Sequence, residues 1–212
     1  MFLAAFHDVS LALSTPSDSI PRTYNYFAYG SNVCTSTMTN LRGIKPLGSS
    51  AAILPEHELR FNIPGIPLVE PSWASVEPIA DKSKVVHGVL YKLTEADFTA
   101  VCKSEGVPLG YVLHRCRPIP YLGDDNCAGQ RKAESSDENG VLAYTLRAPK
   151  RYRGEESNIP PSRSYMNIIL RGCKENRLDK KYIDYLERFP VGKTLLGNGV
   201  AEEMLKRAES KS

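Results

Sequence analysis

The stretch Tyr26-Phe27-Ala28-Tyr29-Gly30-Ser31-Asn32 decides the fold, because an aromatic run stops abruptly at three small or polar residues. Aromatic side chains suit a pleated, half-buried surface, so residues 26–29 predict a strand. Gly30 permits a tight turn, and Ser31 and Asn32 are turn or helix-cap formers. A strand that enters such a turn aims backbone N–H groups at one point, which suits a carboxylate or an oxyanion. From these residues alone, an ordinary turn remains the alternative.

Many short strands separated by proline and glycine favour a curled sheet or barrel over a parallel doubly wound fold. Residues 64–67, Pro-Gly-Ile-Pro, predict a rigid loop. We expect helices that begin at residues 94, 160, 179 and 201, and a helical turn at 8–13. Strands are expected at residues 49–54, 57–63, 73–77, 85–93, 111–118, 120–122 and 140–146.

The helix expected over residues 94–106 carries a carboxylate at its inner end. Thr94 is typical of a helix N-cap, and Gly106 of the C-terminal stop. Phe98 and Val101 share one face at helical spacing, and Glu105 continues that face. Glu105 faces water if the helix end frays. If it turns inward, burial disfavours its charged form, which suits a group that accepts and returns a proton.

Three stretches in order resemble the γ-glutamylcyclotransferase family. They are residues 26–32, residues 104–107 (Ser-Glu-Gly-Val), and residues 160–176, which run from Pro-Pro-Ser through Tyr165 to Gly-Cys-Lys-Glu-Asn. The resemblance covers most of residues 24–190. It implies an α+β fold, a small mixed or antiparallel β-barrel with flanking helices. Residues 24–212 would form this single domain, behind an N-terminal extension and linker at residues 1–23.

The resemblance also implies site residues and a reaction. The α-amine of a γ-glutamyl substrate attacks its own γ-carbonyl, releasing 5-oxoproline and an amine, with Glu105 as general acid and base. It implies no metal and no organic cofactor. Taken from the residues alone, Tyr165 would be read as core packing. The substrate-binding residues implied are Tyr26, Phe27, Ala28, Tyr29, Gly30, Ser31, Asn32, Tyr111, Tyr144 and Tyr165.

The substrate expected is a small-molecule γ-glutamyl amino acid or an adduct derived from glutathione. Similar fungal proteins belong to pathways that make sulfur-bridged dipeptide toxins such as gliotoxin. The N-terminal extension and the charged loops at residues 130–140 and 148–158 depart from the compact family core. They would enlarge or cover the pocket for such an adduct.

Composition limits the other classes of function. The 212 residues have a net charge of +3 without a long basic run, which argues against a nucleic-acid partner. The apolar start, residues 1–6, is interrupted by His7 and Asp8, which argues against a secretory signal or a membrane span. Five cysteines without a C-x-x-C pair predict neither a disulfide framework nor a zinc site, but reduced thiols in the cytoplasm. The sequence leaves a homodimer open.

Two other classes remain as alternatives. One is a cysteine hydrolase built on Cys34, although the sequence offers no recognisable activating histidine. His114 is expected to be an ordinary strand residue. The other is a non-catalytic module of the same fold that binds γ-glutamyl compounds or other small molecules. The presence of both the Gly-Ser turn and Glu105 favours the enzyme.

Overall fold

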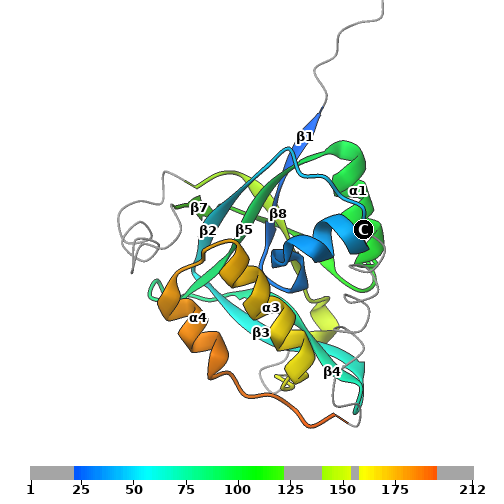
Figure 1. The fold of residues 1–212 in the computed structure, drawn as a ribbon, viewed down its shortest axis with the longest axis vertical. Helices are drawn as coiled ribbons and strands as arrows, with labels where there is room; N and C mark the ends of the chain where they lie inside the picture. Colours follow the sequence, from blue (N-terminus) through cyan, green and yellow to red (C-terminus); the bar gives the residue numbers. More distant parts are fainter. Residues whose placement is uncertain (1–21, 122–139, 154–157, 195–212) are drawn as a thin grey trace, which may run out of the picture.

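The computed structural model describes residues 22–121, 140–153 and 158–194. A mixed six-stranded sheet forms the body of the protein in the order β6-β8-β1-β5-β2-β7 (Figure 1). β1 pairs in parallel with β8, and the other neighbours pair antiparallel. The strands are β1 (Thr23–Ala28), β2 (Gly48–Pro55), β5 (Val85–Thr94), β6 (Val112–Cys116), β7 (Ile119–Pro120) and β8 (Ala143–Arg147).

The α+β class, with a mixed sheet and flanking helices, is confirmed. Among the described strands, β6 and β7 form the two edges of the sheet, and no hydrogen-bonded pairing closes it into a barrel. The elements expected at residues 8–13 and 201–208 lie outside the described residues, as does nearly all of the loop expected at 130–140.

A separate hairpin of β3 (His57–Ile66) and β4 (Glu70–Pro78) extends away from the six-stranded sheet (Figure 1). The loop predicted at residues 64–67 is wrong, because β3 continues through Pro64 to Ile66. A two-stranded ribbon has only edge strands, where a proline without an N–H is tolerated. At Gly65 a Cβ atom would lie 1.9 Å from the Glu70 backbone oxygen, so this close approach of the strands requires glycine.

The expected helix at residues 94–106 is α1 (Glu95–Ser104), with the Thr94 side chain accepting from the Asp97 backbone N–H. Glu105 ends the helix, and Gly106 follows with a φ of +65°. The N-cap and the glycine stop are therefore confirmed. A 3-10 turn, η1 (Ser31–Val33), and a π-helical turn, η2 (Thr37–Leu41), follow β1, and η3 (Lys150–Tyr152) follows β8.

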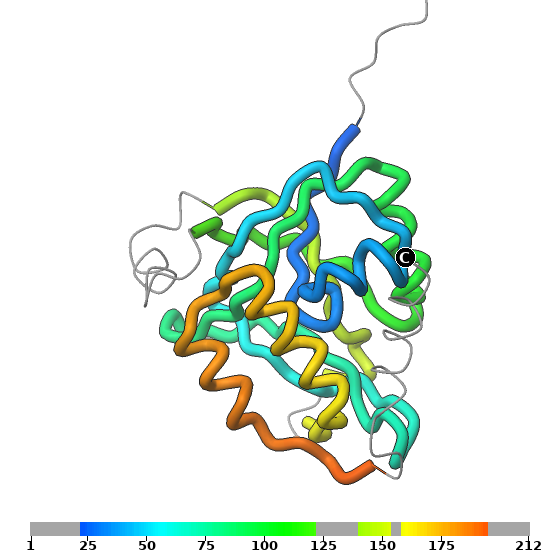
Figure 2. Tube along the Cα trace, in the orientation of Figure 1, coloured from blue at the N-terminus to red at the C-terminus, as the bar shows by residue number. Residues whose placement is uncertain are grey.

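α3 (Arg163–Glu175) and α4 (Lys180–Glu187) run side by side across one side of the molecule (Figure 2). The predicted inner face of α3 is confirmed, because all four of its residues are buried: Tyr165, Ile168, Ile169 and Gly172. A Cβ at Gly172 would lie 2.4 Å from the Cys34 backbone nitrogen, so α3 packs directly on the backbone that follows the turn. The predicted helix face thus positions residues 30–34.

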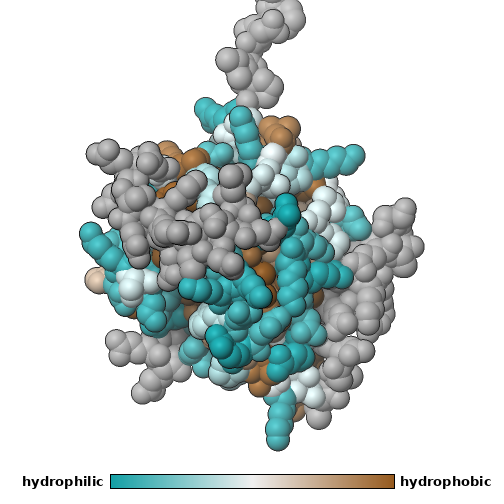
Figure 3. All heavy atoms as spheres, turned by 60° about the vertical axis from the view of Figure 1, so that its left-hand side comes forward, coloured by the Kyte–Doolittle hydropathy of each residue, from teal (hydrophilic) through white to brown (hydrophobic). Residues whose placement is uncertain are grey.

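Hydrophilic residues cover most of the described surface in the view of Figure 3, with apolar residues in small patches between them. Within the described ranges, no helix is long and apolar enough to cross a membrane.

Candidate active site

Two adjoining cavities lie beside the turn at residues 30–32. The outer cavity has a volume of about 440 Å³ and the inner cavity about 20 Å³. The outer volume is within the range of about 300–1,000 Å³ that small-molecule pockets span. Four residues line both cavities: Ser31, Glu105, Tyr111 and Tyr165.

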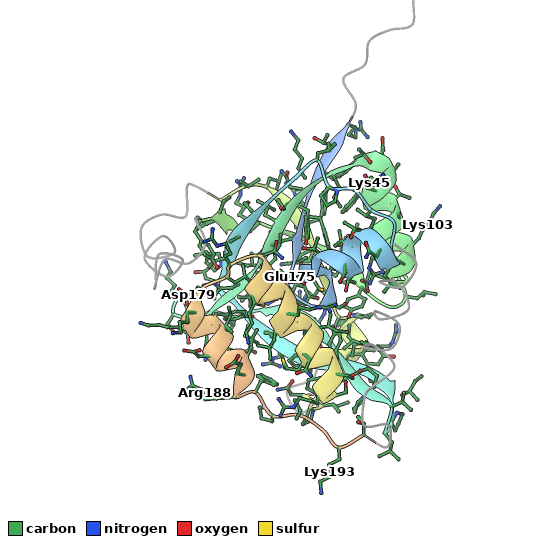
Figure 4. All side chains as sticks on the ribbon, in the orientation of Figure 1. Lys45, Lys103, Glu175, Asp179, Arg188 and Lys193 are labelled. Atoms are coloured by element: carbon green, nitrogen blue, oxygen red, sulfur yellow. The ribbon has the colours of Figure 1, made fainter. Side chains whose placement is uncertain are left out.

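The turn is held in place by contacts from two other elements. The Tyr91 hydroxyl on β5 donates to the Asn32 backbone oxygen at 3.1 Å. The Asn176 side chain at the end of α3 donates to the Val33 backbone oxygen at 2.8 Å. Figure 4 labels Glu175 at the same end of α3, where its carboxylate accepts from the Thr35 backbone N–H at 3.1 Å. These contacts add to the hydrogen bonds within the turn, in which the Val33 and Cys34 backbone N–H groups donate to the Gly30 and Ser31 oxygens.

Gly30 is needed because a tyrosine ring approaches the turn closely. A Cβ atom at Gly30 would lie 3.1 Å from the Tyr165 hydroxyl oxygen. That oxygen also interacts with the backbone N–H groups of Ser31 and Ala74. A larger residue at position 30 would push the hydroxyl away from the turn.

Glu105 turns inward, which is one of the two orientations that the helical spacing left open. Its side chain is only 13% exposed, and its Oε1 atom accepts from the Arg42 guanidinium at 2.5 Å and from the Asn32 side-chain amide at 2.9 Å. The same Asn32 amide donates to the Tyr26 hydroxyl at 2.9 Å. By contrast, Lys103, two residues earlier, is exposed and points away from the body of the protein (Figure 4).

The sequence argument expected apolar surroundings to disfavour the charge of Glu105. The structure instead supplies a cation, Arg42, whose positive charge stabilises the carboxylate. Among the described residues, hydrogen bonds are found to Oε1 and not to Oε2. Glu105 therefore presents one held oxygen and one oxygen that is available to a molecule in the cavity.

Three tyrosine hydroxyls converge on β4 and β8. Tyr111 donates to the Ala74 backbone oxygen at 2.9 Å, and Tyr29 donates to the Leu146 backbone oxygen at 2.6 Å. The Ala74 backbone N–H donates to Tyr165 at 3.4 Å. Burial raises the pKa of all three tyrosines, so their hydroxyls remain neutral donors at physiological pH.

Three residues of the predicted binding set do not line either cavity. Tyr144 pairs with Tyr26 across the β1–β8 ladder, but its ring packs 5.6 Å from the ring of Phe98 on α1. α1 therefore occupies the part of the sheet face over Tyr144. Phe27 and Ala28 are fully buried in the core and contribute no cavity wall. The other predicted residues, Tyr26, Tyr29, Gly30, Ser31, Asn32, Glu105, Tyr111 and Tyr165, line one or both cavities.

Sequence reasoning missed much of the outer cavity wall. Arg42 lies outside the three stretches that carry the family resemblance, and no motif marks it. Trp73 packs edge-on against Tyr165, with 5.1 Å between the ring centroids. Because Trp73 is the single tryptophan of the chain, the sequence could have marked it as a candidate pocket residue. The other missed wall residues are Ile63, Pro64, Ser104, Gly110, Arg151 and Tyr152.

A separate cavity of about 260 Å³ lies between β3, β5 and the start of α4, where Figure 4 labels Asp179. It is lined by none of the predicted site residues. Burial lowers the pKa of His87, one of its wall residues, to about 4, so this imidazole is neutral at pH 7.

Among the described residues, no hydrogen bond joins the alternative nucleophile, Cys34, to a histidine. Cys34 is fully buried, its sulfur lies 3.3 Å from the Ser36 hydroxyl, and it lines neither active-site cavity. His114 instead lies 3.1 Å from His57, between their Nε2 atoms, and burial lowers its pKa to about 4. In the part of the chain that the structure describes, no group of three His, Cys, Asp or Glu side chains is arranged to hold a metal ion.

Comparisons with known proteins converge on one family. The profile of the AIG2-like family matches residues 85–186, from β5 into α4. The γ-glutamyl cyclotransferase gliK of Aspergillus fumigatus is 34% identical over 183 residues, which are 78% of this chain and 62% of the relative. The chain thus spans less than two thirds of that fungal protein. The γ-glutamylcyclotransferase of Bos taurus is 27% identical over 158 residues, covering 74% of this chain and 73% of the relative.

Solved structures are similar in fold. One γ-glutamyl cyclotransferase structure superposes with a TM-score of 0.66 at 21% identity, over 89% of this chain and 99% of that chain. At this identity the likeness concerns the arrangement of helices and strands, and it agrees with the α+β architecture described above.

Proposed function

The chain belongs to the γ-glutamylcyclotransferase (AIG2-like) family, and on that premise we propose that it closes γ-glutamyl amides to 5-oxoproline and releases the amine. One observation carries the proposal. The Glu105 carboxylate and the turn at residues 30–32, which are far apart in sequence, line the same cavity. An intramolecular acyl transfer needs a group that carries a proton and hydrogen-bond donors that stabilise the oxyanion.

In this mechanism Glu105 carries one proton. The substrate α-amine arrives protonated and gives a proton to Oε2 of Glu105. The free amine attacks the γ-carbonyl carbon, forming the ring C–N bond and an oxyanion. Glu105 returns its proton to the leaving nitrogen as collapse of that intermediate breaks the original amide C–N bond. The ring nitrogen then gives up its second proton to the released amine, which leaves as the ammonium form. The carboxylate ends in its starting state, so no other reagent is consumed.

The turn and the tyrosines would bind the negative groups of the substrate. The Tyr165 hydroxyl accepts from the Ser31 and Ala74 backbone N–H groups and donates to none of the described residues, so its own proton is available to substrate. The Tyr111 hydroxyl donates to the Ala74 oxygen and would have to exchange that partner for substrate. Each donor aimed at a developing oxyanion typically contributes about 3 kcal/mol in the transition state. Because the attack is intramolecular, holding the γ-glutamyl chain folded supplies much of the remaining acceleration.

The outer cavity would hold the leaving amine. Its walls include the apolar side chains of Ile63, Pro64 and Trp73, and the cation of Arg151. This lining suits a leaving group larger than a single small amino acid. With the similarity to gliK proteins, it supports a glutathione-derived adduct in fungal sulfur-containing toxin biosynthesis as the substrate class. The four described cysteines are free thiols, which agrees with a cytoplasmic enzyme.

The test is release of 5-oxoproline by the purified protein. γ-Glutamyl-alanine, glutathione and a bis-glutathione adduct are incubated separately, and 5-oxoproline is measured by chromatography with mass detection. We expect the adduct to be turned over fastest. Equal activity on the small dipeptide would contradict the toxin-pathway substrate while leaving the reaction intact.

The role of Glu105 is tested by Glu105→Gln, which keeps the shape and removes the proton carrier. We expect turnover to fall by about 100-fold or more, with binding retained, because general acid–base catalysis typically contributes 10²–10⁴-fold. Near-normal 5-oxoproline release by this variant would refute the assignment. Binding without release by the unaltered protein would indicate a non-catalytic binding module.

A further inference from the structure

Arg42 is the best-connected charged side chain of the site, and nothing in the sequence motifs marks it. Nη2 contacts Oε1 of Glu105 at 2.5 Å, Nε donates to Oδ1 of Asn32 at 2.8 Å, and Nη1 donates to the Ser104 hydroxyl. The guanidinium is only 13% exposed. One planar group therefore joins the turn after β1 to the C-terminal end of α1.

We propose that Arg42 is the positioning residue for Glu105, holding Oε1 so that Oε2 is the oxygen that exchanges the proton with substrate. This rests on the function proposed above. Arg42 acts directly on Oε1, and it also acts through Asn32. Because Nε of Arg42 donates to Oδ1 of Asn32, the amide nitrogen of Asn32 must face Glu105 and Tyr26. The Asn32 amide thereby links the Glu105 carboxylate to the turn at residues 30–32.

The local backbone explains how Arg42 reaches both partners. Residues Thr37–Leu41 form a π-helical turn, and the Arg42 backbone N–H donates to the Thr37 oxygen at 3.2 Å. π-Helical turns are rare and occur frequently at functional sites. Gly43 follows with a φ of +67°, which reverses the chain directly after Arg42. The wide turn and the reversal place the guanidinium over the end of α1.

An arginine is required here because three acceptors are bound in different directions. A guanidinium offers five donors in a rigid plane, whereas a lysine ammonium is a single point charge. Besides Arg42, the charged and titratable groups that share the cavities with Glu105 come from β1 and the turn after it, the loop before β6, η3 and α3: Tyr26, Tyr29, Tyr111, Arg151, Tyr152 and Tyr165. Cys102 lies about one turn earlier on α1. Burial keeps Tyr26, Tyr29, Tyr111 and Tyr165 neutral, and among the described residues Arg42 is the cation that contacts the carboxylate.

The experiment compares Arg42→Gln and Arg42→Lys with Arg147→Gln, the same substitution in a second buried ion pair outside the cavities. For Arg42→Gln we expect kcat to fall by about 100-fold with a smaller change in KM, because a misplacement of about 1 Å can cost that much.

Arg42→Lys separates charge from geometry. It keeps the cation, but we expect kcat still to fall because Asn32 and Ser104 lose their donor. Arg147→Gln should leave both kcat and KM of the folded protein unchanged. An unchanged kcat in Arg42→Gln, or full activity in Arg42→Lys, would overturn the proposal.

A direct structural comparison keeps this test independent of the activity. Crystal structures of the unaltered protein, of Arg42→Gln and of Arg147→Gln would show where the Glu105 carboxylate lies. We expect it to leave its contact with the Asn32 amide in Arg42→Gln and to keep that contact in Arg147→Gln. An unmoved carboxylate in Arg42→Gln would overturn the proposal. If Arg42→Gln does not fold, Arg42→Lys takes its place with the same expected displacement and the same refuting outcome. An unaltered protein that releases no 5-oxoproline would refute the proposed reaction but would leave this comparison readable.

Discussion

Two buried arginine–carboxylate pairs in this protein are alike in chemistry and different in arrangement. Arg42 pairs with Glu105 beside the cavities, and Arg147 of β8 pairs with Glu77 of β4 at 2.7 Å. Glu77 has both oxygens occupied, since Oε2 accepts twice from Arg147 and Oε1 accepts from the Ser75 hydroxyl at 3.0 Å. Among the described residues, Glu105 has contacts at only one oxygen.

The difference indicates which pair serves the scaffold and which serves chemistry. Glu77 and Arg147 line none of the three cavities, and they join the hairpin to the six-stranded sheet. A carboxylate whose acceptors are all satisfied inside the protein has no capacity left for a ligand. A buried carboxylate with one open oxygen facing a cavity does have that capacity. Glu77 and Glu105 therefore differ in the number of carboxylate oxygens that accept hydrogen bonds within the protein, which we call the count of occupied oxygens, rather than in burial.

The largest expected effect that follows from this comparison is on stability. Arg147→Ala leaves the Glu77 charge buried without its partner, so we expect the free energy of unfolding to fall by about 3 kcal/mol. Glu105→Gln should change it by less than about 1 kcal/mol, because Gln keeps an acceptor for Arg42. Urea unfolding followed by circular dichroism measures both. If Glu105→Gln were as unstable as Arg147→Ala, the assignment of the first pair to chemistry and the second to the scaffold would be contradicted.

A smaller effect concerns the tyrosines. Tyr165→Phe removes a hydroxyl at the turn, and we expect kcat/KM to fall by about 100-fold, because a donor to the developing oxyanion is typically worth about 3 kcal/mol. Tyr144→Phe is the matched control, because its ring packs under α1 by Phe98 and not in the cavities. Steady-state kinetics on the best γ-glutamyl substrate measures both variants. An equal loss of kcat/KM in Tyr144→Phe would indicate that Tyr144 also binds substrate.

The smallest effect concerns a third buried acid, Glu70, whose two oxygens accept from the Ser162 backbone N–H at 3.1 Å and the Ser162 hydroxyl at 2.6 Å. Burial raises the pKa of Glu70 above its ordinary 4.5, although the Ser162 hydrogen bonds oppose the shift. The folded chain therefore retains this proton at pH values where the unfolded chain has released it. In that window, just above pH 4.5, the Glu70 contribution to stability falls as the pH rises.

Because glutamine does not ionise, Glu70→Gln should remove this part of the pH dependence, which thermal unfolding between pH 4 and 7 would detect. By the count of occupied oxygens, Glu70 belongs with Glu77, so the kcat of the folded variant should be unchanged. A loss of turnover comparable to that of Glu105→Gln would contradict the rule drawn from the two ion pairs.

The parts of the site that sequence reasoning predicted are those determined by local chemistry. The cap at Thr94, the stop at Gly106 and the inward face of α1 follow from neighbouring residues, and together they turn Glu105 inward. The inner face of α3 follows from helical spacing in the same way. Tyr144 was included from the family resemblance. Strand register pairs it with Tyr26, but the side chains that cover its ring depend on where α1 packs, which the sequence does not show.

By itself, the sequence determined the strand-turn at residues 26–32, the helix that ends in Glu105, and the family to which both point. Only the tertiary structure decided that Arg42, 63 residues before Glu105, meets one oxygen of that carboxylate and leaves the other open to the cavity. The reason is physical. Caps, turns and helical faces depend on residues a few positions apart, whereas the partners of a buried charge depend on how distant segments pack, which no local pattern records.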